Sequence, residues 1–260
     1  MNKRAPKWGQ NFLTCTWPID LMIKAGQIKT GDNVLEIGSG KGILTTSLLK
    51  TGAIVTAIEK DSELVKILKE KFISELENKK MFLIETDIRD WLKQKKLPLN
   101  TPYKVVANIP YYLTGHLLKN LLTATPQPQT IILLIQQEVA QRITETKKNN
   151  ILKLAIEAYG KPKIIKKVPA GCFQPPPKVD SAILAITDIN QSFFKDFSPE
   201  YFFSILKQGF GSKRQILKKQ IGLTEKDLTQ LDLPLMVRAE DLDLEKWKKL
   251  TLYVKNKNND

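Results

Sequence analysis

The chain has 260 residues, 42% of them hydrophobic, which is enough for one large domain with its own core and a second, small domain. Its 41 lysines and arginines exceed its 27 aspartates and glutamates, and the resulting formal net charge of +14 favours a polyanionic partner, with nucleic acid the leading candidate. Apolar runs stay below the roughly 18 residues of a membrane-spanning helix and no signal peptide is visible, so we expect a cytoplasmic protein without a membrane partner.

Residues 33–37 predict a short buried strand that leads into the glycine-rich loop 38–42 and then into a helix. Glycine lets a backbone approach a ligand closely at a helix N-terminus, which makes Gly38 and Gly40 candidate cofactor contacts. The dinucleotide-binding fingerprint has its third glycine one position later, where this chain has Ile43. The spacing Glu-x-Gly-x-Gly-x-Gly is instead typical of S-adenosylmethionine loops, with an ordinary strand-to-helix turn as the alternative.

The next two predicted strands are followed by carboxylates. Residues 53–58 end at Glu59, about 20 residues beyond Gly38, which is the separation expected of a ribose-binding acid in a doubly wound sheet. Residues 81–84 lead to Asp87, whose carboxylate could accept a hydrogen bond from a cofactor adenine amine. Either acid could instead be a solvated loop charge. Because ligands of such sheets bind at the carboxyl ends of the strands, the shared position favours a cofactor site.

A fourth apolar run, residues 103–107, ends in the tetrapeptide Asn108-Ile109-Pro110-Tyr111. The amino group of adenine or cytosine is a poor nucleophile, so an enzyme that alkylates it must accept hydrogen bonds from both N–H groups. The side-chain oxygen of Asn108 can accept one, and the Ile109 carbonyl, held by the fixed φ of Pro110, can accept the other. Tyr111 offers a face on which the base can stack. The alternative is an Asn-Pro turn after a buried strand.

The cysteines and the histidine do not predict a metal site. Cys15 and Cys172 are far apart and lack metal-ligand spacing, so we expect both to be reduced thiols. His116, the single histidine, follows the tetrapeptide on a predicted helix, where a structural or surface role is expected. We expect neither a metal nor a strong base, because a methylated amine can lose its proton to water.

The later part of the chain predicts a strand at 130–135, a helix from 137, and a hairpin between 164–168 and 181–186. Phe173 precedes three consecutive prolines, which exclude helix and predict a rigid extended segment. Its ring is a second candidate for holding a base, and a core phenylalanine is the alternative.

From about Ser198 the pattern is helical only. A basic cluster follows there that fits either RNA backbone contact or a solvated face: Lys213, Arg214, Lys218 and Lys219. We expect a cofactor-binding catalytic domain at 1–187, a small helical RNA-contacting domain at 188–255 and a disordered tail at 256–260.

With these motifs in view, the chain resembles the family of ribosomal RNA adenine N6,N6-dimethyltransferases over nearly its whole length. The segments that carry the resemblance are 7–13, 36–42, 108–111, 137–140 and 173–182. The resemblance implies an α/β fold with a Rossmann-like class I methyltransferase sheet and a small C-terminal helical domain. It also implies that Tyr111 and Phe173 hold a flipped adenine, and it implies these contacts to S-adenosylmethionine: Asn11, Leu13, Gly38, Glu59, Asp87 and Asn108.

The implied function is dimethylation of adenosines near the 3′ end of small-subunit rRNA, in ribosome biogenesis, with the pre-small ribosomal subunit as partner and a monomeric enzyme. The chain departs from the family pattern at Ala239, where proline is usual, and at residues 146–154, which lack the usual Tyr-Gly pair. The second departure concerns the RNA surface that is contacted more than the chemistry. One alternative is the Erm branch, which methylates large-subunit rRNA and confers macrolide resistance, although Lys178-Val179-Asp180-Ser181-Ala182 after the prolines favours the first branch. Another is a catalytically idle RNA-binding assembly or transcription factor, against which the intact motifs argue.

Overall fold

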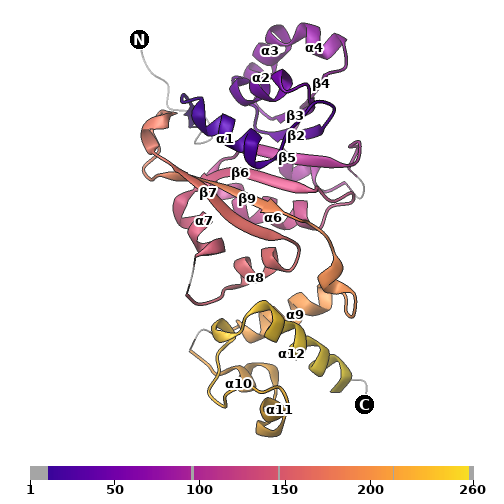
Figure 1. Cartoon of the computed structure of the whole chain (residues 1–260), viewed down its shortest axis with the longest axis vertical. Coiled ribbons are helices and arrows are strands. Elements are labelled where there is room, and N and C mark those ends of the chain that lie inside the picture. Colours follow the sequence, from indigo (N-terminus) through magenta and orange to yellow (C-terminus); the bar gives the residue numbers. More distant parts are fainter. Residues whose placement is uncertain (1–10, 95–96, 146, 213, 258–260) are drawn as a thin grey trace. The chain divides into compact units, whose positions relative to one another are not determined.

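The structure is a computed structural model that describes residues 11–94, 97–145, 147–212 and 214–257, with the backbone alone at Tyr111. The chain forms two compact units, one of residues 1–141 and 161–189 and the other of residues 142–160 and 190–260 (Figure 1). The sequence placed 142–160 in the first domain. These residues group with the helical unit because their helix α8 (Ile151–Glu157) packs on α9 (Pro199–Gly209). The functional roles of the two domains stay predictions.

The first unit is built on a seven-stranded sheet in the order β4-β3-β2-β5-β6-β9-β7. The hairpin of β7 (Lys161–Val168) and β9 (Ser181–Thr187) is antiparallel, as predicted, and joins the sheet along β6. The remaining neighbours are all parallel: β2 (Asn33–Ile37), β3 (Ile54–Glu59), β4 (Met81–Glu85), β5 (Tyr103–Asn108) and β6 (Thr130–Gln136).

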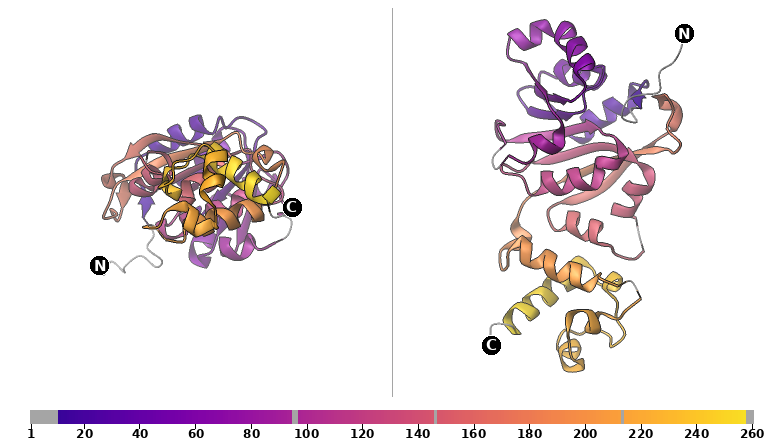
Figure 2. Two further views of the ribbon diagram at one scale, coloured as in Figure 1. Left: turned by 90° about the horizontal axis from the view of Figure 1, so that it is seen from below. Right: turned by 180° about the vertical axis from the view of Figure 1, so that it is seen from behind.

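Helices cover both faces of this sheet. Residues 131–135 of β6 are wholly buried, and such a continuous apolar run is typical of a parallel strand covered on both sides. In Figure 1 α1 (Trp17–Ala25) lies in front of the sheet, and the view from behind in Figure 2 brings α6 (Thr114–Leu122) to the front. The predicted Rossmann-like fold class is confirmed. The other helices of this unit are α2 (Ile43–Lys50), α3 (Ser62–Lys71), α4 (Ile73–Glu77), α5 (Ile88–Trp91) and the start of α7 (Gln137–Thr144).

A two-stranded ribbon ties the N-terminal segment to the segment before the prolines. In it β1 (Phe12–Leu13) pairs antiparallel with β8 (Phe173–Gln174), and Thr14 N donates to the carbonyl of Cys172 at 2.8 Å. This pairing brings Cys15 and Cys172 together, with their Cα atoms 5.1 Å apart, and the two form a disulfide. The prediction of reduced thiols is therefore wrong. The two cysteines are 157 residues apart in the sequence, so no local spacing pattern could predict that they pair.

The second unit is helical, as its sequence pattern predicts. Its core centres on Trp247, Phe202 and Leu217, which are fully buried, and the ring of Trp247 lies so close to Gly209 that a Cβ there would be 2.5 Å from it. The expected disordered tail is wrong for Asn256 and Lys257, which belong to α12, while 258–260 lie outside the described residues. Besides α8 and α9 the helices are α10 (Leu217–Ile221), α11 (Glu225–Gln230) and α12 (Leu244–Lys257).

Candidate active site

A pocket opens at the carboxyl ends of β2, β3 and β5, where the sequence placed the site. β1 and the short 3-10 turn η2 (Tyr111–Leu113) complete its wall. The structure brings together ten of the predicted site residues in this wall: Asn11, Leu13, Gly38, Gly40, Glu59, Asp87, Asn108, Ile109, Pro110 and Phe173. Their individual roles stay predictions.

The glycine loop needs its glycines. Gly38, Gly40 and Gly42 have φ of +73°, +57° and +73°, in the left-handed region that side chains disfavour. A Cβ on Gly40 would lie 3.3 Å from the ring of Phe12, and one on Gly38 would face the carbonyl oxygen of Asn108 at 3.8 Å. The loop therefore keeps its bare backbone toward the pocket. Between these glycines the side chain of Ser39 is buried, lines the pocket and helps to hold down the pKa of its neighbour Glu36.

Glu59 is fixed at the end of β3 by backbone amides. One carboxylate oxygen accepts from Gly40 N at 2.9 Å, and the other accepts from Lys60 N at 2.9 Å and Asp61 N at 3.0 Å. The side chain is almost fully buried yet lines the pocket. A carboxylate has about four lone-pair positions, so the amides orient Glu59 and leave it able to accept from a ligand hydroxyl.

Asp87 caps α5 and forms an ion pair with Arg89. Its carboxylate accepts from the Nε of Arg89 at 3.0 Å and from a terminal guanidinium nitrogen of Arg89 at 2.7 Å. These bonds hold the pKa of Asp87 down at about 2. The pocket thus has a permanent acceptor at this end of β4, where the sequence predicted contact with a cofactor adenine.

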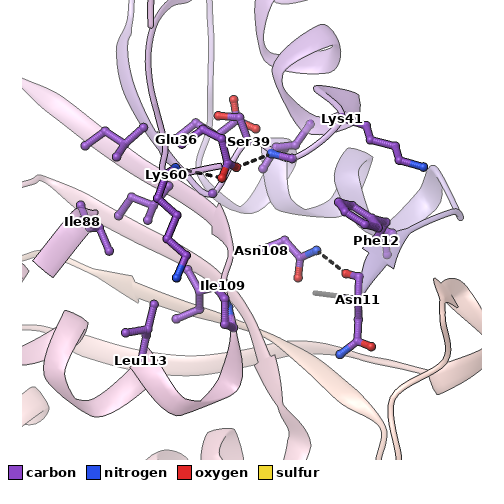
Figure 3. Close-up of a pocket in the computed structure, with 18 of the residues that line it drawn as sticks. Asn11, Phe12, Glu36, Ser39, Lys41, Lys60, Ile88, Asn108, Ile109 and Leu113 are labelled. Carbon is purple, nitrogen blue, oxygen red and sulfur yellow. Dashed lines mark hydrogen bonds between the residues drawn. The ribbon is translucent and has the colours of Figure 1, made fainter. Parts of the chain in front are cut away.

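Asn108 is the last residue of β5 and faces the N-terminal segment. Its amide nitrogen donates to the carbonyl of Asn11 at 3.4 Å (Figure 3), which leaves the side-chain oxygen as an acceptor toward the pocket. Ile109 is buried, and Leu113 N donates to the Pro110 carbonyl at 3.0 Å, which closes η2. The stacking role predicted for Tyr111 lies outside the described residues, because its side chain is not described.

Phe173 is a core residue that also lines the pocket, and its predicted contact with a base stays a prediction. Its ring is 3% exposed and belongs to the hydrophobic core together with Leu13 and Met22, while the residue also lines the pocket. A base in the pocket would therefore meet a ring already held by the core.

Glu36 is a pocket residue to which the sequence assigned no role. It is fully buried near the end of β2, and its carboxylate accepts from the Thr45 hydroxyl at 2.6 Å. Burial raises its pKa to about 7, against the donated hydrogen bond that lowers it. The signal that could have found it is an acid inside an otherwise apolar strand.

The described residues of the predicted basic cluster belong to the second unit. Arg214 and Lys219 are exposed in the second unit, Lys218 pairs with Glu225 at 2.7 Å, and the prediction for Lys213 falls outside the described residues. His116 is exposed on α6. In the described part of the chain, His, Cys, Asp and Glu form no group of three suited to a metal ion, and no helix is long and apolar enough to cross a membrane.

The sheet order and the pocket at the strand ends define a methyltransferase of Rossmann-like fold. Two solved structures share the fold over nearly the whole chain. The crystal structure of the 23S rRNA methyltransferase ErmE has a TM-score of 0.76 at 23% identity, covering 94% of this chain and 100% of that chain. A dimethyladenosine transferase from Plasmodium falciparum has a TM-score of 0.79 at 25% identity, covering 95% and 98%.

The sequence comparisons are more specific. A family model described as "Ribosomal RNA adenine dimethylase" matches residues 1–254. The Ribosomal RNA small subunit methyltransferase A of Dehalococcoides mccartyi is 36% identical, over 94% of this chain and 86% of that protein. The protein of the same name from Thermosynechococcus vestitus is also 36% identical, over 95% of each. The chain belongs to the ribosomal RNA adenine dimethylase family, which confirms the predicted resemblance and the predicted enzyme class.

Proposed function

We propose that this enzyme dimethylates N6 of adenosines near the 3′ end of small-subunit rRNA, with S-adenosylmethionine as methyl donor. The observation that carries the proposal is that Asn108, the glycine loop, Glu59 and Asp87 all line one pocket. The names of the relatives, which specify the small subunit, support the choice of substrate.

The pocket fits this cofactor in the chemistry of its donors and acceptors. Glu59, oriented by three amides, suits the hydroxyls of a ribose, and ionised Asp87 suits the amine of an adenine. The bare loop around Gly38 and Gly40 allows a ligand to approach the backbone closely.

The protein's part in the chemistry is positioning. The bound cofactor supplies an electrophilic methyl group on a positively charged sulfur. The side-chain oxygen of Asn108 accepts a hydrogen bond from one N–H of the target adenine, and the Ile109 carbonyl accepts one from the other. The nitrogen lone pair is then directed toward the methyl group instead of being delocalised into the adenine ring. Phe173 contributes an apolar face, and the proton released after transfer passes to water.

The partner of the enzyme is then the pre-small ribosomal subunit, and the net charge of +14 fits that polyanion. We place the enzyme, as a monomer, in the cytoplasm, where that subunit is assembled. A disulfide such as Cys15–Cys172 is rare in that compartment, so the placement rests on the substrate and not on the cysteines.

The fold likeness to a 23S rRNA methyltransferase makes large-subunit rRNA the second candidate. Labelled S-adenosylmethionine is offered with undermethylated small subunits and, separately, with large-subunit rRNA, and the labelled adenosines are mapped. We expect label on adenosines near the 3′ end of the small-subunit rRNA and strongly reduced labelling with the Asn108→Ala variant. Label only on large-subunit rRNA would contradict the proposal, and RNA binding without transfer to either would indicate an idle assembly factor.

A further inference from the structure

The rim of the pocket carries an aromatic ring that the reaction just described does not use. Tyr112 is 61% exposed, although its neighbour Leu113 in the same turn is 9% exposed. It follows Asn108-Ile109-Pro110 directly and lines the pocket. The hydrogen bond from Leu113 N to the Pro110 carbonyl fixes this turn. An ordered, solvated aromatic ring at the mouth of a nucleobase pocket is a surface on which a second base can stack.

Arg89 reaches the pocket wall through its ion pair with Asp87. Its side chain is 51% exposed, and its guanidinium is held by two hydrogen bonds to Asp87, at the pocket wall. The carboxylate of Asp87, with a smaller contribution from the phenol of Tyr112, raises the pKa of the Arg89 guanidinium. A guanidinium has five N–H donors, so the pair with Asp87 leaves donors for a phosphate. The pocket thus has a planar aromatic group in its lining and a cation held on one of its wall residues.

Two lysines add positive charge to the same mouth. The side chain of Lys60 reaches from the end of β3 toward Ile109 and Leu113 (Figure 3), and Lys41 lies over the ring of Phe12, 5.0 Å from its centroid. Aromatic rings together with cations in one groove are the usual composition of sites for single-stranded nucleic acid.

We propose that Tyr112 stacks on the nucleotide next to the target adenosine and that Arg89 contacts the phosphate beside it. The inference rests on the proposed function, because an adenine extruded to Asn108 brings its neighbours in the strand to this rim. The rim thus binds the unpaired strand around the target and adds to the grip on the target base itself.

The test compares three replacements of Tyr112 with RNA substrate in steady-state methylation. Tyr112→Ala and Tyr112→Leu should raise the RNA KM by about 5- to 100-fold, as expected for loss of one base–aromatic stack, with little change in kcat at saturating RNA. Tyr112→Phe should restore the RNA KM, because it keeps the ring. Phe82→Ala is the matched control, an aromatic side chain 43% exposed on β4 that does not line the pocket, and it should leave the RNA KM unchanged.

A second readout does not depend on turnover. RNA carrying 2-aminopurine next to the target adenosine should lose fluorescence on binding the wild type or Tyr112→Phe, and should keep it with Tyr112→Ala. Equal RNA KM for wild type and Tyr112→Ala, or rescue by Tyr112→Leu as good as by Tyr112→Phe, would overturn the stacking proposal. If the wild type itself does not methylate small-subunit RNA, the proposed function fails instead, so the two failures are distinguishable.

Discussion

Replacing Gly42 by alanine should destabilise the first unit by about 2–5 kcal/mol. Gly42 caps α2 with φ of +73°, and a left-handed alanine costs about 1–2 kcal/mol. An added Cβ would lie 2.7 Å from the ring of Phe72 and 2.9 Å from a methyl of Leu68. Both side chains are buried, at 4% and 0% exposure, so they have little room to yield, and overpacking of this kind costs about 1–3 kcal/mol more.

Urea denaturation followed by circular dichroism measures the loss in the free energy of unfolding. The Gly31→Ala variant separates the backbone cost from the steric cost. Gly31 has φ of +84° in the same unit, and a Cβ there would meet nothing within 4 Å, so its replacement should cost only the backbone term of about 1–2 kcal/mol. If both variants lose the same stability at an unchanged m-value, the steric argument for Gly42 is wrong.

Four further outcomes are expected. Asn108→Ala should lower kcat on the order of a hundredfold or more while cofactor affinity falls less; near-normal turnover would refute its role. As pH rises from 4.5 through about 7, the wild type should lose about 3 kcal/mol of stability, because the raised pKa of Glu36 in the folded state favours folding only while the carboxyl is protonated. The Glu36→Gln variant should not show this loss, and parallel pH profiles of the two proteins would contradict the prediction. Serine at Cys15 should lower the free energy of unfolding under oxidising conditions by up to about 5 kcal/mol, given a closed loop of 157 residues, and have no such effect in reductant. Glutamine should replace all four residues of the basic cluster, Lys213, Arg214, Lys218 and Lys219. This change should flatten the slope of log K against log salt for RNA binding by about 0.7–0.9 per lost phosphate contact and leave cofactor binding unchanged. An unchanged slope would place the RNA surface elsewhere.

The sequence predicts the pocket well because its features are local. A strand followed by a glycine loop or an acid can be recognised within a few residues, and parallel strands bring their carboxyl ends to one edge, which is why Gly38, Glu59 and Asn108 could be grouped without coordinates. Features that depend on distant segments could not be predicted. The contact between Cys15 and Cys172 follows from the pairing of β1 with β8, and the exposure of Tyr112 follows from how η2 packs.

The interleaved course of the chain limits how the enzyme can be dissected. Residues 142–160 enter the second unit before the sheet is finished, and there Tyr159 packs against Phe194, with ring centroids 4.8 Å apart. Ending the gene after Ile189 would therefore delete α9, which packs on α8, and Phe194, whose ring packs on the buried ring of Tyr159. Such a fragment would carry an unsatisfied apolar surface and tend to aggregate. The contribution of each unit to RNA binding is better separated by single substitutions in the full-length enzyme than by truncation.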